Sequence, residues 1–257
     1  MNDPLEGLDR NGNIVTGVAR LHISSPYDTL VAECVDALLV GLGHLLHSIF
    51  VYGSVVTGQA VVGRSDLDLL VVVKQHGEAH EILAPVQART PIVRSIGVGV
   101  VTLNDLLAPT EEGRIERCFL HHYCVCVWGE DLRSQTSPCE PTPALARGFA
   151  GGLLQKLPAV LSSDWTSVTD PAAYGRYLLM AAAMAMSVGA DDWSTDRATG
   201  AALIAQHDPQ AGQDAAAVWS WADSQGPSFG SLPEDHRAQL SRLSRWVHDA
   251  YERLPPD

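Results

Sequence analysis

The chain has 257 residues, of which 46% are hydrophobic and 18% charged, and this composition is typical of a soluble globular protein with one large or two modest domains. Its formal net charge is −13, and lysine occurs only at Lys74 and Lys156, so it lacks the basic track that a DNA- or RNA-binding enzyme needs. No apolar run reaches the roughly 18 residues of a membrane span. The sequence therefore favours a small, cationic partner, drawn by the acidic field, over nucleic acid or a membrane.

The cysteines point to a reducing compartment. There are five, an odd number, and none has the C-x-x-C spacing of a zinc site. Cys124 and Cys126 alternate within an apolar run, which indicates buried free thiols. The N-terminus lacks the basic and apolar regions of a signal peptide. We therefore expect a cytoplasmic protein.

The first half of the chain alternates between helical and strand patterns. Residues 1–24 are polar and contain Gly and Asn, and we expect a loosely ordered lead-in there. Ser25-Pro26 is a helix-start signal, and the apolar spacing after it predicts a long helix to about His47. Apolar, β-branched runs then predict strands at 49–52, 67–74, 92–102 and 124–128, with helices at 78–87 and 112–122 and short helices after Ser54 and near 104–107.

A change of composition at residues 134–143 separates two regions. This segment holds three prolines and predicts a linker. The predicted domains are therefore an N-terminal one over residues 1–133 and a C-terminal one over 144–257. Helical patterns fill the second, at 144–161 (interrupted by Gly151-Gly152 and Pro158), 172–188, 195–206, 211–224 and 234–254. The expected fold class is an N-terminal α/β (α+β) domain with a small mixed sheet, followed by an all-α helical bundle.

Two acidic residues open the second strand. Side chains alternate along a strand, so Asp66 and Asp68 share a face, and their Cα atoms are roughly 6–7 Å apart. Two carboxylates at this spacing can hold Mg²⁺ together with substrate phosphates. Gly53, at the end of the preceding strand, lets the backbone approach a phosphate, and Ser54 follows it. The alternative is a solvent-facing Asp-x-Asp at the start of an ordinary strand.

This pattern resembles the DNA-polymerase-β-type nucleotidyltransferase superfamily, whose signature is Gly-Ser, a spacer, and Asp-hydrophobic-Asp-hydrophobic. Gly53-Ser54, Gly58 and the run Ser65-Asp66-Leu67-Asp68 look most like bacterial antibiotic nucleotidyltransferases of the streptomycin/spectinomycin kind. A Gly-Glu-Asp-Leu turn at 129–132 adds to the likeness. The motif covers about a tenth of the chain, and the order of elements extends the likeness over most of the rest.

The resemblance implies a function and assigns roles. Gly53 and Ser54, with Gly58 and Ser65, would hold the phosphates of ATP, and Asp66 and Asp68 would bind Mg²⁺. Arg64 would contact phosphate, unless it is simply an exposed turn residue. A hydroxyl of a small, cationic acceptor such as an aminoglycoside would receive AMP, and pyrophosphate would leave.

The sequence departs from the family at two places. The family has a third carboxylate on the next long strand, where our alignment brings Gly97, and no Asp or Glu occurs between Glu81 and Asp105. A family Ser-Lys segment aligns with Ser194 to Asp196, which are also explained as a helix cap. Two hypotheses therefore remain: an active nucleotidyltransferase, or a catalytically weakened relative that binds nucleotide or a partner protein.

Overall fold

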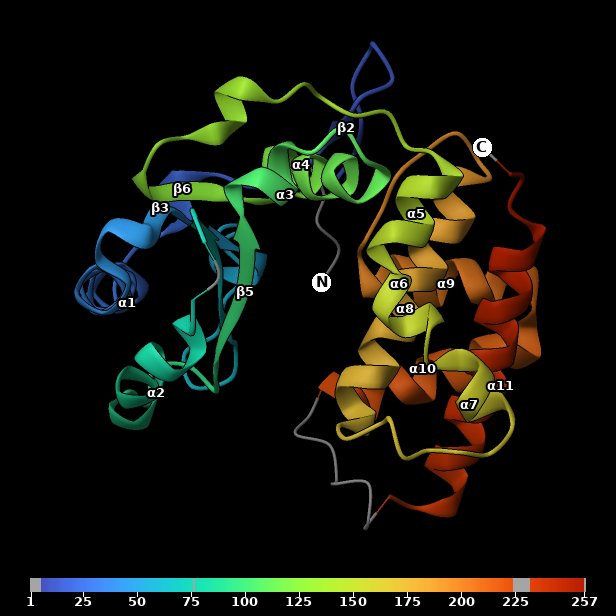
Figure 1. Cartoon of the computed structure of the whole chain (residues 1–257). Helices are drawn as coiled ribbons and strands as arrows, with labels where there is room; N and C mark the ends of the chain where they lie inside the picture. Colours follow the sequence, from blue (N-terminus) through green and yellow to red (C-terminus); the bar gives the residue numbers. More distant parts are fainter. Residues whose placement is uncertain (1–5, 76, 224–231, 257) are drawn as a thin grey trace. The chain divides into compact units, whose positions relative to one another are not determined.

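The computed structural model describes residues 6–75, 77–223 and 232–256 (Figure 1). The described chain divides into two compact units. Residues 16–139 form a unit built on a β-sheet, and residues 6–15 together with the part described after residue 139 form a mainly helical unit. The change from one unit to the other falls inside the predicted linker segment, residues 134–143.

The sheet of the first of these units is small and mixed, as predicted. Its strands are β3 (Leu46–Tyr52), β4 (Leu67–Val73), β5 (Ile96–Thr102) and β6 (Val125–Gly129). They lie in the order β5-β4-β3-β6, with β4 and β5 parallel and the other two pairs antiparallel. The inner strands β3 and β4 are buried along nearly their whole length, which explains their continuous apolar runs.

Helices cover both faces of this sheet (Figure 1). These are α1 (Tyr27–Leu42), α2 (Ala79–Arg89), α3 (Leu103–Leu107) and α4 (Glu111–Tyr123). Alternation along β4 divides the core: Leu69 and Val71 pack in one cluster with α1 and α2, whereas Leu70 and Val72 pack in a second cluster with α3 and α4. The side chain of Asp68 follows the same alternation and belongs to the α3 and α4 face.

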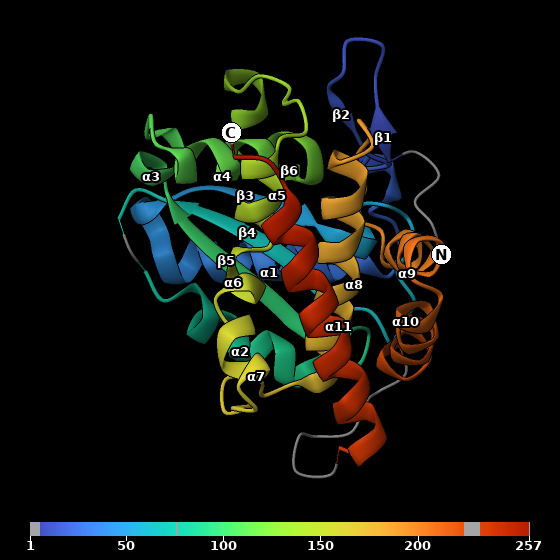
Figure 2. The same ribbon diagram turned by 90° about the vertical axis from the view of Figure 1, so that its right-hand side faces the viewer.

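The other unit is a bundle of helices, as predicted (Figure 2). They are α5 (Pro143–Phe149), α6 (Gly151–Leu154), α7 (Leu157–Leu161), α8 (Pro171–Val188), α9 (Arg197–His207), α10 (Pro209–Asp223) and α11 (Glu234–Arg253). The helix predicted at 144–161 is divided into α5, α6 and α7: Gly151-Gly152 begins α6, and Pro158 lies in the first turn of α7. Helix α8 is almost completely buried because α5, α9, α10 and α11 all pack against it. The final residue of the helix predicted at 211–224 lies outside the described residues.

The prediction of a loosely ordered lead-in was wrong for residues 6–24, while residues 1–5 lie outside the described chain. Strands β1 (Gly7–Leu8) and β2 (Ile14–Val15) form a hairpin, whose turn is closed by the Asp9 carboxylate accepting hydrogen bonds from the backbone. The Glu6 carboxylate accepts hydrogen bonds from Ser194 Oγ at 3.0 Å and Thr195 Oγ1 at 2.7 Å. Polar side chains, which carry no periodic signal, order this segment.

Two predicted boundaries also shift. Gly43, at φ 52°, ends α1, and β3 begins at Leu46, whereas the helix was predicted to reach His47. Strand β5 begins at Ile96, although its apolar run starts at residue 92. Residues 92–95 do not continue the strand, because the Arg94 backbone N–H donates to the Ser65 carbonyl and the Arg94 side chain binds Asp66.

Other expectations from composition agree with the structure. All five cysteines are free, and Cys124 and Cys126 are buried as predicted. Within the described ranges, no helix combines the length and the apolar character needed to cross a membrane.

The close packing of α9 on α8 yields a stability prediction. A Cβ at Gly200 would lie 2.0 Å from the Leu179 carbonyl oxygen, whereas a Cβ at Gly152 would meet nothing within 4 Å. We expect Gly200→Ala to lower the free energy of unfolding by about 2–4 kcal/mol, because backbone has to move. Gly152→Ala, the matched control in α6, should leave it unchanged or raise it by up to about 1 kcal/mol. Urea denaturation followed by circular dichroism measures both, and equal effects would contradict the packing described here.

Candidate functional site

The carboxylate of Asp68 lies against two glycines. In the sheet, Asp68 on β4 pairs with Tyr52 on one side and with Gly97 on the other. A Cβ at Gly53 would lie 2.6 Å from Asp68 Oδ2, and a Cβ at Gly97 would lie 2.6 Å from Asp68 Oδ1. The two carboxylate oxygens of Asp68 therefore occupy space that a side chain at position 53 or 97 would fill.

This environment disfavours the charge of Asp68. Burial, and then the neighbouring Asp66 carboxylate, raise the pKa of Asp68 to about 6, against an opposing effect of Arg94. Among the hydrogen bonds of the described residues, none is donated to the Asp68 carboxylate. A bound cation would stabilise the ionised form of such a group.

Asp66 is neutralised by a different arrangement. Its carboxylate accepts a bidentate pair from Arg94, with Nε at 3.1 Å from Oδ1 and Nη2 on Oδ2. Ser95 Oγ also donates to Oδ1, at 2.5 Å. The ion pair is partly exposed, with about a third of the Arg94 side chain and a quarter of the Asp66 side chain accessible (35% and 25%). Asp66 is thus held in place from the segment that leads into β5.

The predicted phosphate-binding residues follow β3. Gly53 has φ 74°, a left-handed conformation that favours glycine, and it begins a one-turn 3-10 helix, η3 (Gly53–Val55). Ser54 lies on this turn, half buried, and its carbonyl accepts from the Gln59 amide. Gly58 also has a positive φ, 72°, and a Cβ there would come within 3.4 Å of the His22 ring.

The structure places Ser65 and Arg64 on the turn that leads into β4. Ser65 Oγ accepts a hydrogen bond from the Val61 amide at 2.9 Å, and the Ser65 amide donates to the Val61 carbonyl, so Ser65 closes the turn. Arg64 is exposed on the same turn. Of the seven predicted site residues, Gly53, Asp66 and Asp68 are brought together by the contacts above. Ser54 lies on the turn that Gly53 begins, and Gly58, Arg64 and Ser65 lie on the segment between η3 and β4.

A third carboxylate is not part of this arrangement. Gly97, which our alignment brings to the place of the family's third carboxylate, stands opposite Asp68 on β5. Asp105 lies on α3, exposed, and accepts a hydrogen bond from Thr102 Oγ1 at 2.6 Å in the helix cap. In the described part of the chain, no Asp, Glu, His or Cys joins Asp66 and Asp68 to make a compact three-ligand group.

Sequence reasoning missed Arg94 and Ser95, which contact Asp66 directly. Their position before a strand that runs parallel to β4 was the available signal, since parallel neighbours begin at the same edge of a sheet. Sequence reasoning also missed a group of three possible metal ligands, Cys118 and His122 on α4 and Cys139 on the segment that follows. The signal there was the i, i+4 spacing of Cys118 and His122, which places both on one face of a helix.

The strands that carry the site are similar in sequence to a known domain family. Residues 42–117, which include β3, β4 and β5, match the family model described as a nucleotidyltransferase domain. Over these residues the chain is similar to nucleotidyltransferase domains. No curated protein matches the sequence. Residues 42–117 hold both carboxylates, Asp66 and Asp68, together with Gly53, Ser54 and Gly97.

The fold extends the comparison over most of the chain. A crystal structure of a spectinomycin adenyltransferase from Enterococcus faecialis, with ATP and spectinomycin, matches with a TM-score of 0.60. The match covers 88% of this chain and 99% of that one at 12% sequence identity. The predicted resemblance to the nucleotidyltransferase fold, with a sheet region followed by helices, is therefore confirmed.

A surface hollow elsewhere does not belong to this site. It lies in the helical unit, between α7, α10 and α11, and its walls include Asp214 and Arg242, which form a bidentate ion pair. None of the predicted site residues lines it. The candidate functional site is therefore the pair of carboxylates at the start of β4, where Asp66 and Asp68 lie beside Gly53 and Gly97.

The raised pKa of Asp68 leads to a prediction about stability and pH. Because the folded pKa, about 6, exceeds the ordinary value of 3.8, Asp68 destabilises the fold above pH 6, and this penalty disappears as the pH falls towards 4. We expect Asp68→Asn to raise the free energy of unfolding by about 1–2 kcal/mol at pH 7.5 without divalent cations, with a smaller gain at pH 5.

Asp66→Asn is the matched control for this measurement. It removes charge from the pair with Arg94 and should lower stability by about 1 kcal/mol at pH 7.5. Urea unfolding in EDTA at pH 7.5 and pH 5 measures the free energy of unfolding of the wild type and of both variants. A stability gain for Asp68→Asn that is the same at pH 7.5 and pH 5 would show that Asp68 is not held in a charge-disfavouring environment.

Proposed function

We propose that this protein is a Mg²⁺-dependent nucleotidyltransferase that moves AMP from ATP onto a hydroxyl of a small, cationic acceptor such as an aminoglycoside. The observation that carries the proposal is the Asp68 carboxylate beside Gly53 and Gly97, with the Asp66 carboxylate near enough to raise its pKa. Metal-assisted transfer from a nucleotide is the chemistry that two such carboxylates beside a Gly-Ser turn support. The similarity to a spectinomycin adenyltransferase fold supports the choice of acceptor class.

The donor set fits Mg²⁺. Asp66 and Asp68 offer hard oxygen ligands from one face of β4, and glycine at 53 and 97 leaves the Asp68 oxygens without a covering side chain. Mg²⁺ bound there would neutralise phosphate charge and hold the triphosphate oxygens in place. This ligand count leaves room for phosphate oxygens and water, which Mg²⁺ retains.

The residues around the carboxylates bind and orient the nucleotide. The Gly53-Ser54 turn allows the triphosphate to approach the backbone, and the Ser54 hydroxyl offers one further donor. Arg94 supplies a positive charge next to Asp66, and its planar guanidinium can bind phosphate oxygens in the same bidentate way. Arg94 would therefore exchange between carboxylate and phosphate as the nucleotide enters.

The transfer itself is an in-line displacement. The acceptor hydroxyl oxygen forms a bond to the α-phosphorus, the bond from that phosphorus to the oxygen bridging to the β-phosphate breaks, and pyrophosphate leaves. The hydroxyl proton has to pass to a base. Since Gly97 occupies the position where the resemblance implies a third carboxylate, an amine of the acceptor or solvent would take this proton.

Gly97 also favours a second candidate function, a catalytically weakened relative that binds nucleotide or a partner protein. A positioned general base contributes about 10²–10⁴-fold to a rate, so a site without one binds nucleotide but transfers slowly. Incubation with labelled ATP and Mg²⁺ across a panel of aminoglycosides separates the two functions. Label in an acceptor supports the transferase, and metal-dependent ATP binding with no transfer supports the binding module.

The first prediction concerns the two carboxylates. Asp66→Asn and Asp68→Asn each keep the side-chain shape but remove a charged metal ligand, so both should abolish the part of ATP affinity that depends on Mg²⁺. Isothermal titration with ATP, with Mg²⁺ or with EDTA, measures this difference. Asp105→Asn, on exposed α3, is the control and should bind like the wild type. Equal stimulation by Mg²⁺ in the wild type and the two site variants would sink the assignment.

The second prediction concerns the glycines of β5. Gly97→Ala would place a Cβ 2.6 Å from Asp68 Oδ1 and displace the carboxylate, so Mg²⁺-ATP affinity should fall about tenfold or more. The same contact means that a carboxylate side chain cannot simply be added at position 97. Gly99→Ala, two residues along the strand, meets Leu70 Cδ1 at an ordinary 3.4 Å and should bind normally. Equal loss in the two variants would point to strand damage instead of carboxylate displacement.

A further inference from the structure

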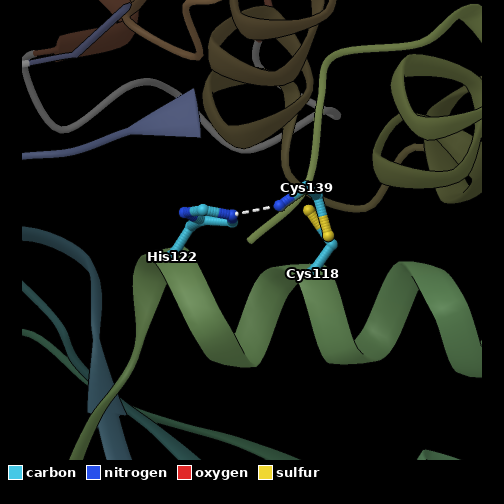
Figure 3. A group of neighbouring side chains, drawn as sticks. All are labelled: Cys118, His122 and Cys139. Carbon is cyan, nitrogen blue, oxygen red and sulfur yellow. Dashed lines mark hydrogen bonds between the residues drawn. The ribbon is translucent and has the colours of Figure 1, made fainter. Parts of the chain in front are cut away.

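Three metal-ligating side chains meet on the side of α4 that faces the segment after η4 (Leu132–Gln135), in the sheet unit (Figure 3). Cys118 and His122 are buried and project from one face of the helix, one turn apart, and the half-buried Cys139 comes from the irregular segment that follows. One ligand atom of each residue lies within 4.8 Å of the others. Cys139 is also the last residue of the sheet unit.

The hydrogen bonding sets the chemical form of the histidine. The Cys139 backbone N–H donates to His122 Nε2 at 2.9 Å (Figure 3). An N–H can only donate, so Nε2 carries a lone pair and points into the group. A neutral imidazole with its lone pair on Nε2 is the form that binds a metal ion.

The two sulfurs complete a donor set for a soft cation. Cys118 and Cys139 offer sulfur ligands, which Zn²⁺ binds as thiolates, so metal binding would release their protons. In a tetrahedral zinc site, with Zn–S about 2.3 Å and Zn–N about 2.0–2.1 Å, ligand atoms are roughly 3.3–3.8 Å apart. The distances between the three ligand atoms therefore need to shorten by about 1.5 Å at most, and the irregular segment carrying Cys139 allows this.

We propose that Cys118, His122 and Cys139 form a binding site for a thiophilic divalent ion of the Zn²⁺ class, distinct from the carboxylate site on β4. Three protein ligands leave one coordination position for water or another small ligand. On binding, Nε2 exchanges its hydrogen bond from the Cys139 amide for the metal. Mg²⁺ is excluded because it takes hard oxygen ligands in octahedral geometry.

Because of the position of this site, a bound metal ion would stabilise the sheet unit. His122 and Cys118 are fixed on α4, whose Leu120 packs in the core against the sheet, while Cys139 stands where the chain leaves this unit. A metal ion there would tie the end of the unit to its own core. Metal bound by the folded form alone stabilises that form by mass action, so zinc should raise the unfolding temperature.

Zinc titration of the reduced full-length protein tests the site. The protein is stripped of metal, kept in a phosphine reductant with excess Mg²⁺, and titrated with Zn²⁺ against a chromophoric chelator. We expect one Zn²⁺ per chain, a higher unfolding temperature, and a tetrahedral thiolate spectrum when Co²⁺ replaces Zn²⁺. Cys139→Ala and His122→Gln should each weaken zinc binding about 100-fold or more.

Matched controls decide between this site and other thiols or imidazoles. His121→Gln changes the neighbouring histidine, and Cys34→Ala changes a buried cysteine on α1; both should bind zinc like the wild type. Asp66→Asn should also keep the zinc, since the carboxylate site is separate. Circular dichroism of the metal-free variants shows that they fold, and Cys139→Ala serves if a helix variant does not.

Two results would overturn the proposal. One is a wild-type protein that takes up no zinc in the reduced state. This includes the case in which Cys118 and Cys139 only form a disulfide when the protein is oxidised. The other is zinc uptake of equal affinity in Cys139→Ala or His122→Gln.

Discussion

The site depends on one close contact, that of the Asp68 carboxylate with the backbone of the two strands beside it. Asp68 lies on a central strand, and glycine at 53 and 97 is the residue type that leaves room for its oxygens. The pairing register of β3, β4 and β5 sets this contact, and a slip of one residue would turn Asp68 to the opposite face. The buried apolar side chains of β4 fix that register, because they divide between two cores.

The two carboxylates of the site differ in how their charge is balanced. Asp66 is paired with Arg94 and Ser95, whereas the Asp68 carboxylate is half buried and its pKa is raised to about 6. A site with one satisfied and one unsatisfied carboxylate is costly to the fold and favourable to a cation. Stability and cation binding are therefore coupled here, and the proposed metal site is also a source of instability.

The sequence predicted the mixed sheet and the helical second half, because buried strands and amphipathic helices leave periodic patterns. The resemblance brought Gly97 to the place of the family's third carboxylate, but its pairing with Asp68 is seen only in the structure. The order of residues 6–15 escaped prediction, since it rests on Glu6 contacting Ser194 and Thr195, which lie far along the chain. Arg94 escaped for the same reason: its role comes from the parallel pairing of two strands. The Cys139 ligand escaped because nothing local indicates that it lies against α4.

A crystal structure with Mg²⁺ and a non-hydrolysable ATP analogue tests the central claim most directly. The account predicts a Mg²⁺ ion about 2.0–2.1 Å from oxygens of Asp66 and Asp68 and of the triphosphate, with the triphosphate against the Gly53-Ser54 turn. It also predicts that Arg94 leaves Asp66 for a phosphate oxygen. A nucleotide bound elsewhere, with the Asp66–Arg94 pair intact and no metal on Asp68, would contradict it.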